Sequence, residues 1–127
     1  MNFYRIFSKL HEFYARKIFS ECSEFIKIDS KILDLGCGSG IIGQKFENLL
    51  KADVTGIDII DNRTVPIDFQ LYDGKNLPFE NDNFDVVLIS YVLHHCHDPI
   101  FTLKEAKRVT KDRIIIYEDL PENPFLK

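Results

Sequence analysis

Apolar residues in the first part of the chain recur at intervals of three or four positions. This spacing places them on one face of an amphipathic helix. It predicts one long helix or two short ones over residues 3–26, and the residues that set the pattern are Phe3, Ile6, Phe7, Leu10, Phe13, Tyr14, Ile18, Phe19, Cys22, Phe25 and Ile26. A second helix is expected over residues 41–50.

Continuous apolar runs of a different kind follow, such as residues 86–89 and 114–116. Such runs are typical of strands that a parallel sheet buries on both faces. The pattern predicts five strands, at residues 31–35, 53–57, 67–72, 84–90 and 112–118.

The junction between the first strand and the helix at residue 41 carries the strongest functional signal. Here the apolar strand runs directly into three alternating glycines: Gly36, Gly38 and Gly40. Glycine suits a turn whose φ angles other residues resist, and it lets a ligand lie against bare backbone. The helix that follows points its N–H groups and positive dipole end at the same place, so the ligand is expected to carry an anionic or carboxylate group.

Two cofactor classes fit these glycines. Residues 38–43 satisfy the dinucleotide fingerprint G-x-G-x-x-G. The glycines that directly follow the strand, with Asp34 inside it, are in a different register. Residues 32–40, Ile-Leu-Asp-Leu-Gly-Cys-Gly-Ser-Gly, resemble the first motif of the class I S-adenosylmethionine-dependent methyltransferases. That cofactor has no pyrophosphate, so the turn need only accept a ribose and an amino-acid tail.

Later segments extend the resemblance in the family's order. Asp58 ends the second strand, about 20 residues beyond the turn, where doubly wound folds hydrogen-bond ribose hydroxyls. Residues 72–79 with 84–90 resemble the stretch in which an acidic residue meets the adenine amino group. Residues 92–99 and 103–109 resemble the segment after the fourth strand and its helix. The resemblance covers residues 31–118.

The resemblance implies a cofactor site for S-adenosylmethionine. Its expected members are Asp34, Gly36, Cys37, Gly38, Gly40, Asp58, Ile59, Asp73, Gly74 and Ser90. Structural alternatives exist for several of them. In these alternatives Asp34 is a buried strand carboxylate satisfied by loop amides, Asp58 is a helix cap or turn residue, and Asp73-Gly74 is a plain turn signature. A small filler residue is the preferred role for the cysteine, and Tyr14 is a candidate cofactor lid or a cover for the sheet.

Residues 94–97, His-His-Cys-His, carry metal-ligand chemistry without metal-ligand spacing. Adjacent residues rarely converge on one ion, and there is no second cysteine pair, so no metal site is expected. The catalytic residue stays unassigned. His94, His95 and Asp98 are candidate bases by position alone.

The implied fold is α/β, a Rossmann-like doubly wound, mostly parallel sheet of order 3-2-1-4-5. We expect one domain over residues 1–127, with a helical segment at 1–28 and an α/β core at 29–127. Two departures from the family are expected. Residues 59–66 are too few for the usual crossover helix, and Pro66 limits any helix there. The family's last helix and two C-terminal strands are missing, which suggests a fragment or a short member.

An ending after the fifth strand would leave that strand as a sheet edge, a place for a homodimer or another partner to pair. Composition narrows the remaining possibilities. A net charge of −4 without a basic stretch disfavours nucleic-acid substrates. Three cysteines without framework spacing suit a reducing, cytoplasmic setting. No apolar run is long enough for a membrane span.

These observations favour an S-adenosylmethionine-dependent methyltransferase acting on an unidentified acceptor, with a small molecule preferred. The alternative is a cofactor-binding module or fragment that is inactive without a partner or the missing C-terminal region. A nicotinamide-linked oxidoreductase is disfavoured because its catalytic half does not fit in 127 residues.

Overall fold

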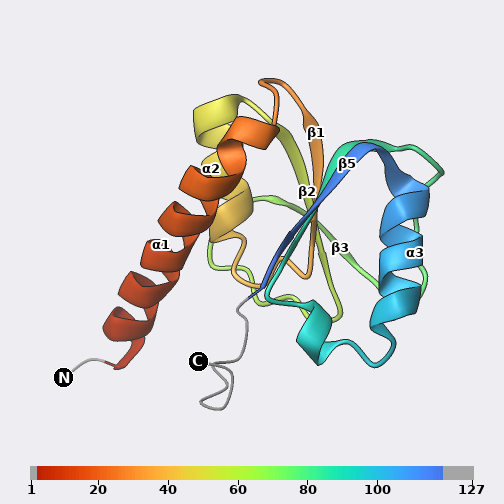
Figure 1. Ribbon diagram of the computed structural model, residues 1–127. Coiled ribbons are helices and arrows are strands. Elements are labelled where there is room, and N and C mark those ends of the chain that lie inside the picture. The colour runs from red at the N-terminus through yellow and green to blue at the C-terminus, as the bar shows by residue number, and fades with distance from the viewer. Residues whose placement is uncertain (1–2, 119–127) are drawn as a thin grey trace, which may run out of the picture.

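A five-stranded parallel sheet forms the centre of the molecule (Figure 1). The computed structural model describes residues 3–118, and their side chains from residue 9 onward. The strand order is β3-β2-β1-β4-β5, and each neighbouring pair is parallel, which confirms the order expected from the sequence. The strands are β1 (Lys31–Leu35), β2 (Asp53–Asp58), β3 (Asp68–Leu71), β4 (Phe84–Ser90) and β5 (Thr110–Tyr117).

Helices cover both faces of this sheet (Figure 1). On one face lie α1 (Phe3–Cys22), which a single 3-10 turn, η1 (Ser23–Phe25), extends, and α2 (Ile41–Leu50). The other face carries α3 (Pro99–Val109), preceded by the short turn η2 (Leu93–His95). Side chains alternate along each strand, so Ile32 joins the core beneath α1 and α2 while Leu33 joins the core beneath α3.

The packing of α1 against α2 fixes the position of α2, the helix that follows the glycine turn. The rings of Phe19 and Phe46 lie 5.1 Å apart between centroids, and Phe46 is fully buried. An ion pair at the surface joins Lys45 Nζ to Glu12 Oε1 at 2.5 Å. Burial of a phenylalanine contributes about 1.5–3 kcal/mol, so the aromatic contact dominates over the partly exposed ion pair.

The connection from β2 to β3 has no helix, as the short segment predicted. Arg63 organises it instead, because its guanidinium pairs with both carboxylate oxygens of Asp61 at 2.9 and 2.8 Å and donates to the carbonyl of Ile67 at 2.8 Å. The same guanidinium lies 4.6 Å from the centre of the Phe69 ring. A network around one arginine therefore replaces a crossover helix.

The connection from β3 to β4 is anchored to α3. The N–H of Leu77 donates to Glu105 Oε2 at 2.8 Å, and Arg108 donates to the carbonyls of Leu77 and Phe79 at 2.9 and 2.7 Å. Leu77 is 5% exposed. These contacts hold the loop that carries Asp73.

The strands β3 and β5 form the two edges of the sheet. Within residues 3–118, β5 pairs with β4 alone, and Ile116 on it is 47% exposed. Residues 119–127, where we expected the loop that leaves the fifth strand, lie outside the described part of the chain. None of the helices within the described residues has the length and apolar character needed to cross a membrane.

The turn after β1 is tied to the end of β2. The N–H groups of Gly36 and Cys37 both donate to the carbonyl of Ile57, at 2.8 and 3.2 Å. Gly36 has a φ of 77°, and a Cβ built on it would lie 2.3 Å from Val92 Cγ2. Gly38 has a φ of 52° but no heavy atom within 4 Å of such a Cβ.

Gly36→Ala is therefore expected to destabilise the chain far more than Gly38→Ala. The first change adds a clash with a stiff β-branched side chain to the cost of a left-handed backbone, about 2–4 kcal/mol in total. The second carries only the backbone cost, about 1–2 kcal/mol. Urea unfolding of both variants measures the difference. Equal losses would contradict the role given to Val92.

Candidate functional site

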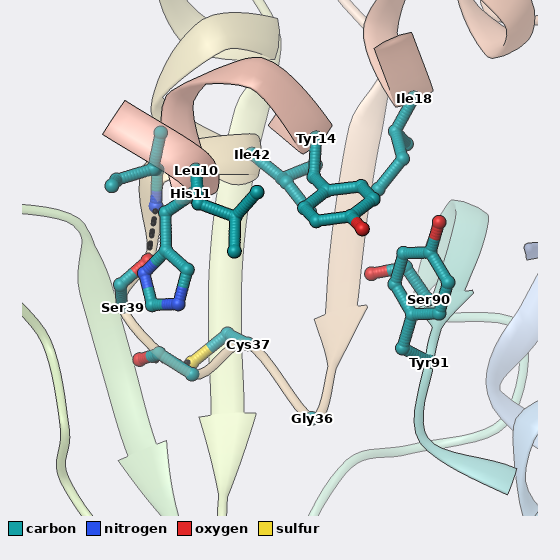
Figure 2. A pocket seen from close by; sticks show the side chains of 12 residues that line it. Leu10, His11, Tyr14, Ile18, Gly36, Cys37, Ser39, Ile42, Ser90 and Tyr91 are labelled. Carbon is teal, nitrogen blue, oxygen red and sulfur yellow. Dashed lines mark hydrogen bonds between the residues drawn. The ribbon is translucent and has the colours of Figure 1, made fainter. Parts of the chain in front are cut away.

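A cavity of about 440 Å³ opens at the carboxyl ends of β1 and β4, beneath the middle of α1 (Figure 2). The glycine turn forms its floor, and residues of α1, α2 and the end of β4 form its walls. Four of the residues expected at the site line it, namely Gly36, Cys37, Gly38 and Ser90. The other lining residues are Leu10, His11, Tyr14, Ile18, Ser39, Ile41, Ile42 and Tyr91.

Asp58 binds the glycine turn directly. Its Oδ2 accepts a hydrogen bond from the N–H of Gly38 at 3.0 Å, and its Oδ1 accepts one from the N–H of Ile59 at 2.8 Å. The carboxylate is half-buried at the end of β2. The expected carboxylate thus lies at the expected strand end, where it also orders the turn.

Asp34 lies inside β1, 1% exposed, and neither of its carboxylate oxygens accepts a hydrogen bond from the described residues. A Cβ on Gly43 of α2 would lie 3.5 Å from its Oδ2, so the carboxyl group faces that helix. Burial, followed by the negative charge of Asp58, raises its pKa from 3.8 to about 7. The alternative that loop amides satisfy this carboxylate is therefore wrong for this structure.

Cys37 fills space beneath the turn. Its side chain is 7% exposed, and a Cβ on Gly56 of β2 would lie 2.8 Å from its Sγ. Burial and the nearby charges of Asp34 and Asp58 raise the pKa of the thiol to about 12. A thiol with that pKa stays protonated at neutral pH and is a poor nucleophile, which supports the role of a small filler.

The residues expected at the adenine end lie outside the cavity lining. Ile59 is 59% exposed, and a Cβ on Gly74 would lie 3.3 Å from its Cγ2, so these two positions are neighbours. Asp73 Oδ1 accepts from the N–H groups of Lys75 and Asn76, at 2.8 and 2.9 Å, and these bonds lower its pKa.

The geometry of Asp73 is that of a turn residue. Gly40 has a φ of 85° and is the N-cap of α2. Both residues shape loops beside the cavity, and their part in holding a cofactor stays a prediction.

Tyr91 is a site residue that no pattern in the sequence indicated. It follows Ser90 directly and has a φ of 57°, a conformation that bulky side chains seldom adopt. Its N–H donates to the carbonyl of Tyr117 at 2.8 Å, which holds the strand end in place. Its ring meets that of Tyr14 edge to face, with 5.9 Å between centroids. Both rings line the cavity, and the lid role of Tyr14 stays a prediction.

The three candidate bases occupy different environments. Nδ1 of His94 lies 2.9 Å from Oε2 of Glu118, whose Oε1 accepts from the N–H of Leu93 at 2.8 Å. Asp98 instead caps α3 by accepting from the N–H of Phe101 at 3.0 Å. The ring of His95 lies 3.8 Å from that of His94. Across residues 3–118, no three side chains of the metal-ligating types come together around one point.

The chain is similar in sequence to known methyltransferases. A family model described as a methyltransferase domain matches residues 33–117. The demethylmenaquinone methyltransferase of Paenarthrobacter aurescens is 34% identical over 102 residues, which is 73% of this chain and 40% of that protein. The ubiquinone biosynthesis O-methyltransferase of Cereibacter sphaeroides is 29% identical, over 74% of this chain and 42% of that protein.

Solved structures share the fold. The YcgJ protein of Bacillus subtilis aligns with a TM-score of 0.70 and 23% identity, over 89% of this chain and 54% of that one. The chain thus spans about two fifths to one half of the length of these proteins. Because the family model matches most of the sheet and the glycine turn, the chain belongs to the class I S-adenosylmethionine-dependent methyltransferases.

Proposed function

We propose that this chain binds S-adenosylmethionine and transfers its methyl group to a small-molecule acceptor. The observation that carries the proposal is the glycine turn held by Asp58 at the floor of a cavity, directly at the carboxyl ends of β1 and β4. Open parallel sheets bind their ligands at this place. Methyl transfer is what the family does, and the two relatives named above are methyltransferases for quinone pathways by name.

The residues present fit the cofactor. Gly38 leaves open space above the turn, Asp34 is a buried carboxylate that no described residue hydrogen-bonds, and Asp58 is half-buried beside both. In this proposal the turn holds the amino-acid tail, Asp58 exchanges its bond to the turn for the ribose hydroxyls, and Ile59 with Gly74 flanks the adenine. The bound cofactor supplies an activated methyl group on a positively charged sulfur.

The chain's own contribution is then positioning and exclusion of water. Methyl transfer needs the acceptor in line with the methyl group at close range, and a cavity with largely apolar walls favours that geometry. Where the acceptor must first lose a proton, a base is also needed. His94 with Glu118 is the better candidate, because Asp98 already caps a helix.

A binding module that needs more chain or a partner is the second candidate. The observation that favours it is length, because this chain covers only 40% and 42% of the two relatives. The exposed edge of β5 is the place where we propose a second copy or another strand pairs. This candidate predicts that the chain alone binds the cofactor without turnover. Turnover that returns when such a partner is added would support this candidate over the first.

We further infer a single domain in a reducing, cytoplasmic compartment. All three cysteines are free; Cys22 is buried in the core beneath α1 and α2, and Cys37 is buried beneath the glycine turn. Disulfide formation would require these thiols to leave their packing. The proposal is therefore consistent with a protein that keeps its thiols reduced.

Asp58→Asn is expected to weaken binding of S-adenosylmethionine by tenfold or more, because an amide replaces the carboxylate that accepts two ribose hydroxyls. Isothermal titration of the purified chain measures the change. Asp53→Asn is the matched control, because Asp53 lies on the same strand at its opposite end. Equal affinity of the two variants, or no binding by the folded parent chain, would contradict the proposed site.

Asp34 gives the stability of the chain a predictable pH dependence. With its pKa raised from 3.8 to about 7, Asp34 is protonated in the folded state but ionised in the unfolded state between about pH 4 and 7. Unfolding then releases a proton, so rising pH favours unfolding. The stability contributed by this group is complete below about pH 4 and is lost as the pH rises through about 7.

The Asp34→Asn variant mimics the protonated acid. The difference between its free energy of unfolding and that of the parent chain should therefore rise by about 2–3 kcal/mol, in favour of the variant, as the pH goes from 5 to 8. Denaturant unfolding at the two pH values measures this difference. Saturating S-adenosylmethionine should reduce it, because the cofactor brings positive charge near the carboxylate. A difference that does not change with pH would show that Asp34 is already ionised at pH 5.

A further inference from the structure

Three tyrosines form a row across the end of the sheet, which we call the tyrosine row: Tyr14 of α1, Tyr91 after β4 and Tyr117 of β5. Neighbouring rings meet edge to face, with centroids 5.9 Å apart for Tyr14 and Tyr91 and 5.5 Å apart for Tyr91 and Tyr117. The first two line the cavity and the third does not. Figure 2 shows Tyr14 and Tyr91 together with Ser90 at one end of the cavity.

The position of Tyr91 is held by several independent contacts. Its φ of 57° is costly for a side chain of this size, and such conformations persist where the surrounding structure enforces them, often at binding sites. Here the bond from its N–H to Tyr117 and the contacts with two rings enforce it. The Glu21 carboxylate, hydrogen-bonded to Tyr117, raises the pKa of that phenol and links the row to α1 again.

The kinds of side chain on the cavity walls make the rings of Tyr14 and Tyr91 the distinctive feature of the cavity. Among the described lining residues there is no aspartate, glutamate, lysine or arginine. Asp34 lies behind the turn and is not part of the lining. A cation that enters the cavity leaves water and meets no carboxylate on the walls. The electron-rich groups on these walls are the rings of Tyr14, Tyr91 and His11, the sulfur of Cys37 and the hydroxyl groups of Ser39 and Ser90, and the two tyrosine rings lie beside Ser90 at one end (Figure 2).

We propose that Tyr14 and Tyr91 recognise the positive charge of the cofactor's sulfonium, and so make the chain prefer S-adenosylmethionine over S-adenosylhomocysteine. This inference rests on the proposed function. A short carbon chain joins the sulfonium to the amino-acid tail, so a tail on the glycine turn places the sulfur near the end of β4. Aromatic faces attract a desolvated cation more strongly than a neutral thioether.

The same preference would help product leave. When the methyl group passes to the acceptor, the electron pair of the broken carbon–sulfur bond stays on sulfur, which becomes an uncharged thioether. The attraction to the tyrosine rings then falls, while every contact with the adenosine and the amino-acid tail is kept. Product is thus held less tightly than cofactor by the sulfur contact alone.

The test compares the two ligands in three proteins by isothermal titration: the parent chain, Tyr91→Leu and Tyr91→Phe. In Tyr91→Leu we expect affinity for S-adenosylmethionine to fall about three- to tenfold, while affinity for S-adenosylhomocysteine changes little. Tyr91→Phe keeps the ring and should keep the preference. Tyr14→Leu provides a second variant at a partly exposed position, should Tyr91→Leu fail to fold.

Each outcome separates this inference from the proposed function. Equal losses for both ligands would show that Tyr91 only packs against the cofactor, and equal affinities in the parent chain would mean that no preference exists. Either result overturns the inference and leaves the cofactor site standing. A folded parent chain that binds neither ligand would overturn the proposed function, and the inference with it.

Discussion

The hydrogen bonds between the glycine turn and the end of β2 hold the candidate site together. The carbonyl of Ile57 accepts from two consecutive N–H groups of the turn, and the Asp58 carboxylate accepts from a third. These bonds require the turn to fold back over β2, which only a backbone with positive φ can do. Val92, which packs where Gly36 lacks a side chain, ties the segment after β4 to the same point. Three strand ends therefore meet at one turn, and the cavity lies above it.

The short connection between β2 and β3 shows how the fold keeps its topology without one of its usual helices. Arg63 supplies contacts to Asp61, to the carbonyl of Ile67 and to the ring of Phe69. Ile67 in turn is 6% exposed, and Cβ atoms built on Gly40 and Gly56 would lie 3.0 and 2.8 Å from its Cδ1. A side chain on either glycine would displace it. The connection between β2 and β3 thus packs against the glycine turn through Ile67.

Charge is distributed unevenly around the cavity. Asp34 and Asp58 lie on the sheet side of the turn, where burial and the charge of Asp58 raise the pKa of Asp34 to about 7. The walls toward α1 are apolar or aromatic. A ligand with a carboxylate tail, a positive centre and a polar ribose would meet backbone N–H groups, aromatic rings and a carboxylate in turn. The arrangement suits a zwitterionic nucleoside better than a polyphosphate, because no lysine or arginine is found among the described residues that line the cavity.

The sequence by itself determined the strand–turn–helix unit and the missing crossover helix, because local patterns decide both, whereas the sheet order was implied by the resemblance to a known family. Apolar runs set the strands, alternating glycines set the turn, and eight residues are too few for a helix and two bends. Tertiary structure alone decided that Asp34 finds no hydrogen-bond partner among the described residues, that Asp73 serves its own loop and that Glu118 bonds His94. It also decided the place of Tyr91, between rings from α1 and β5. Such contacts join residues far apart in the chain, and no local pattern encodes which side chains will meet.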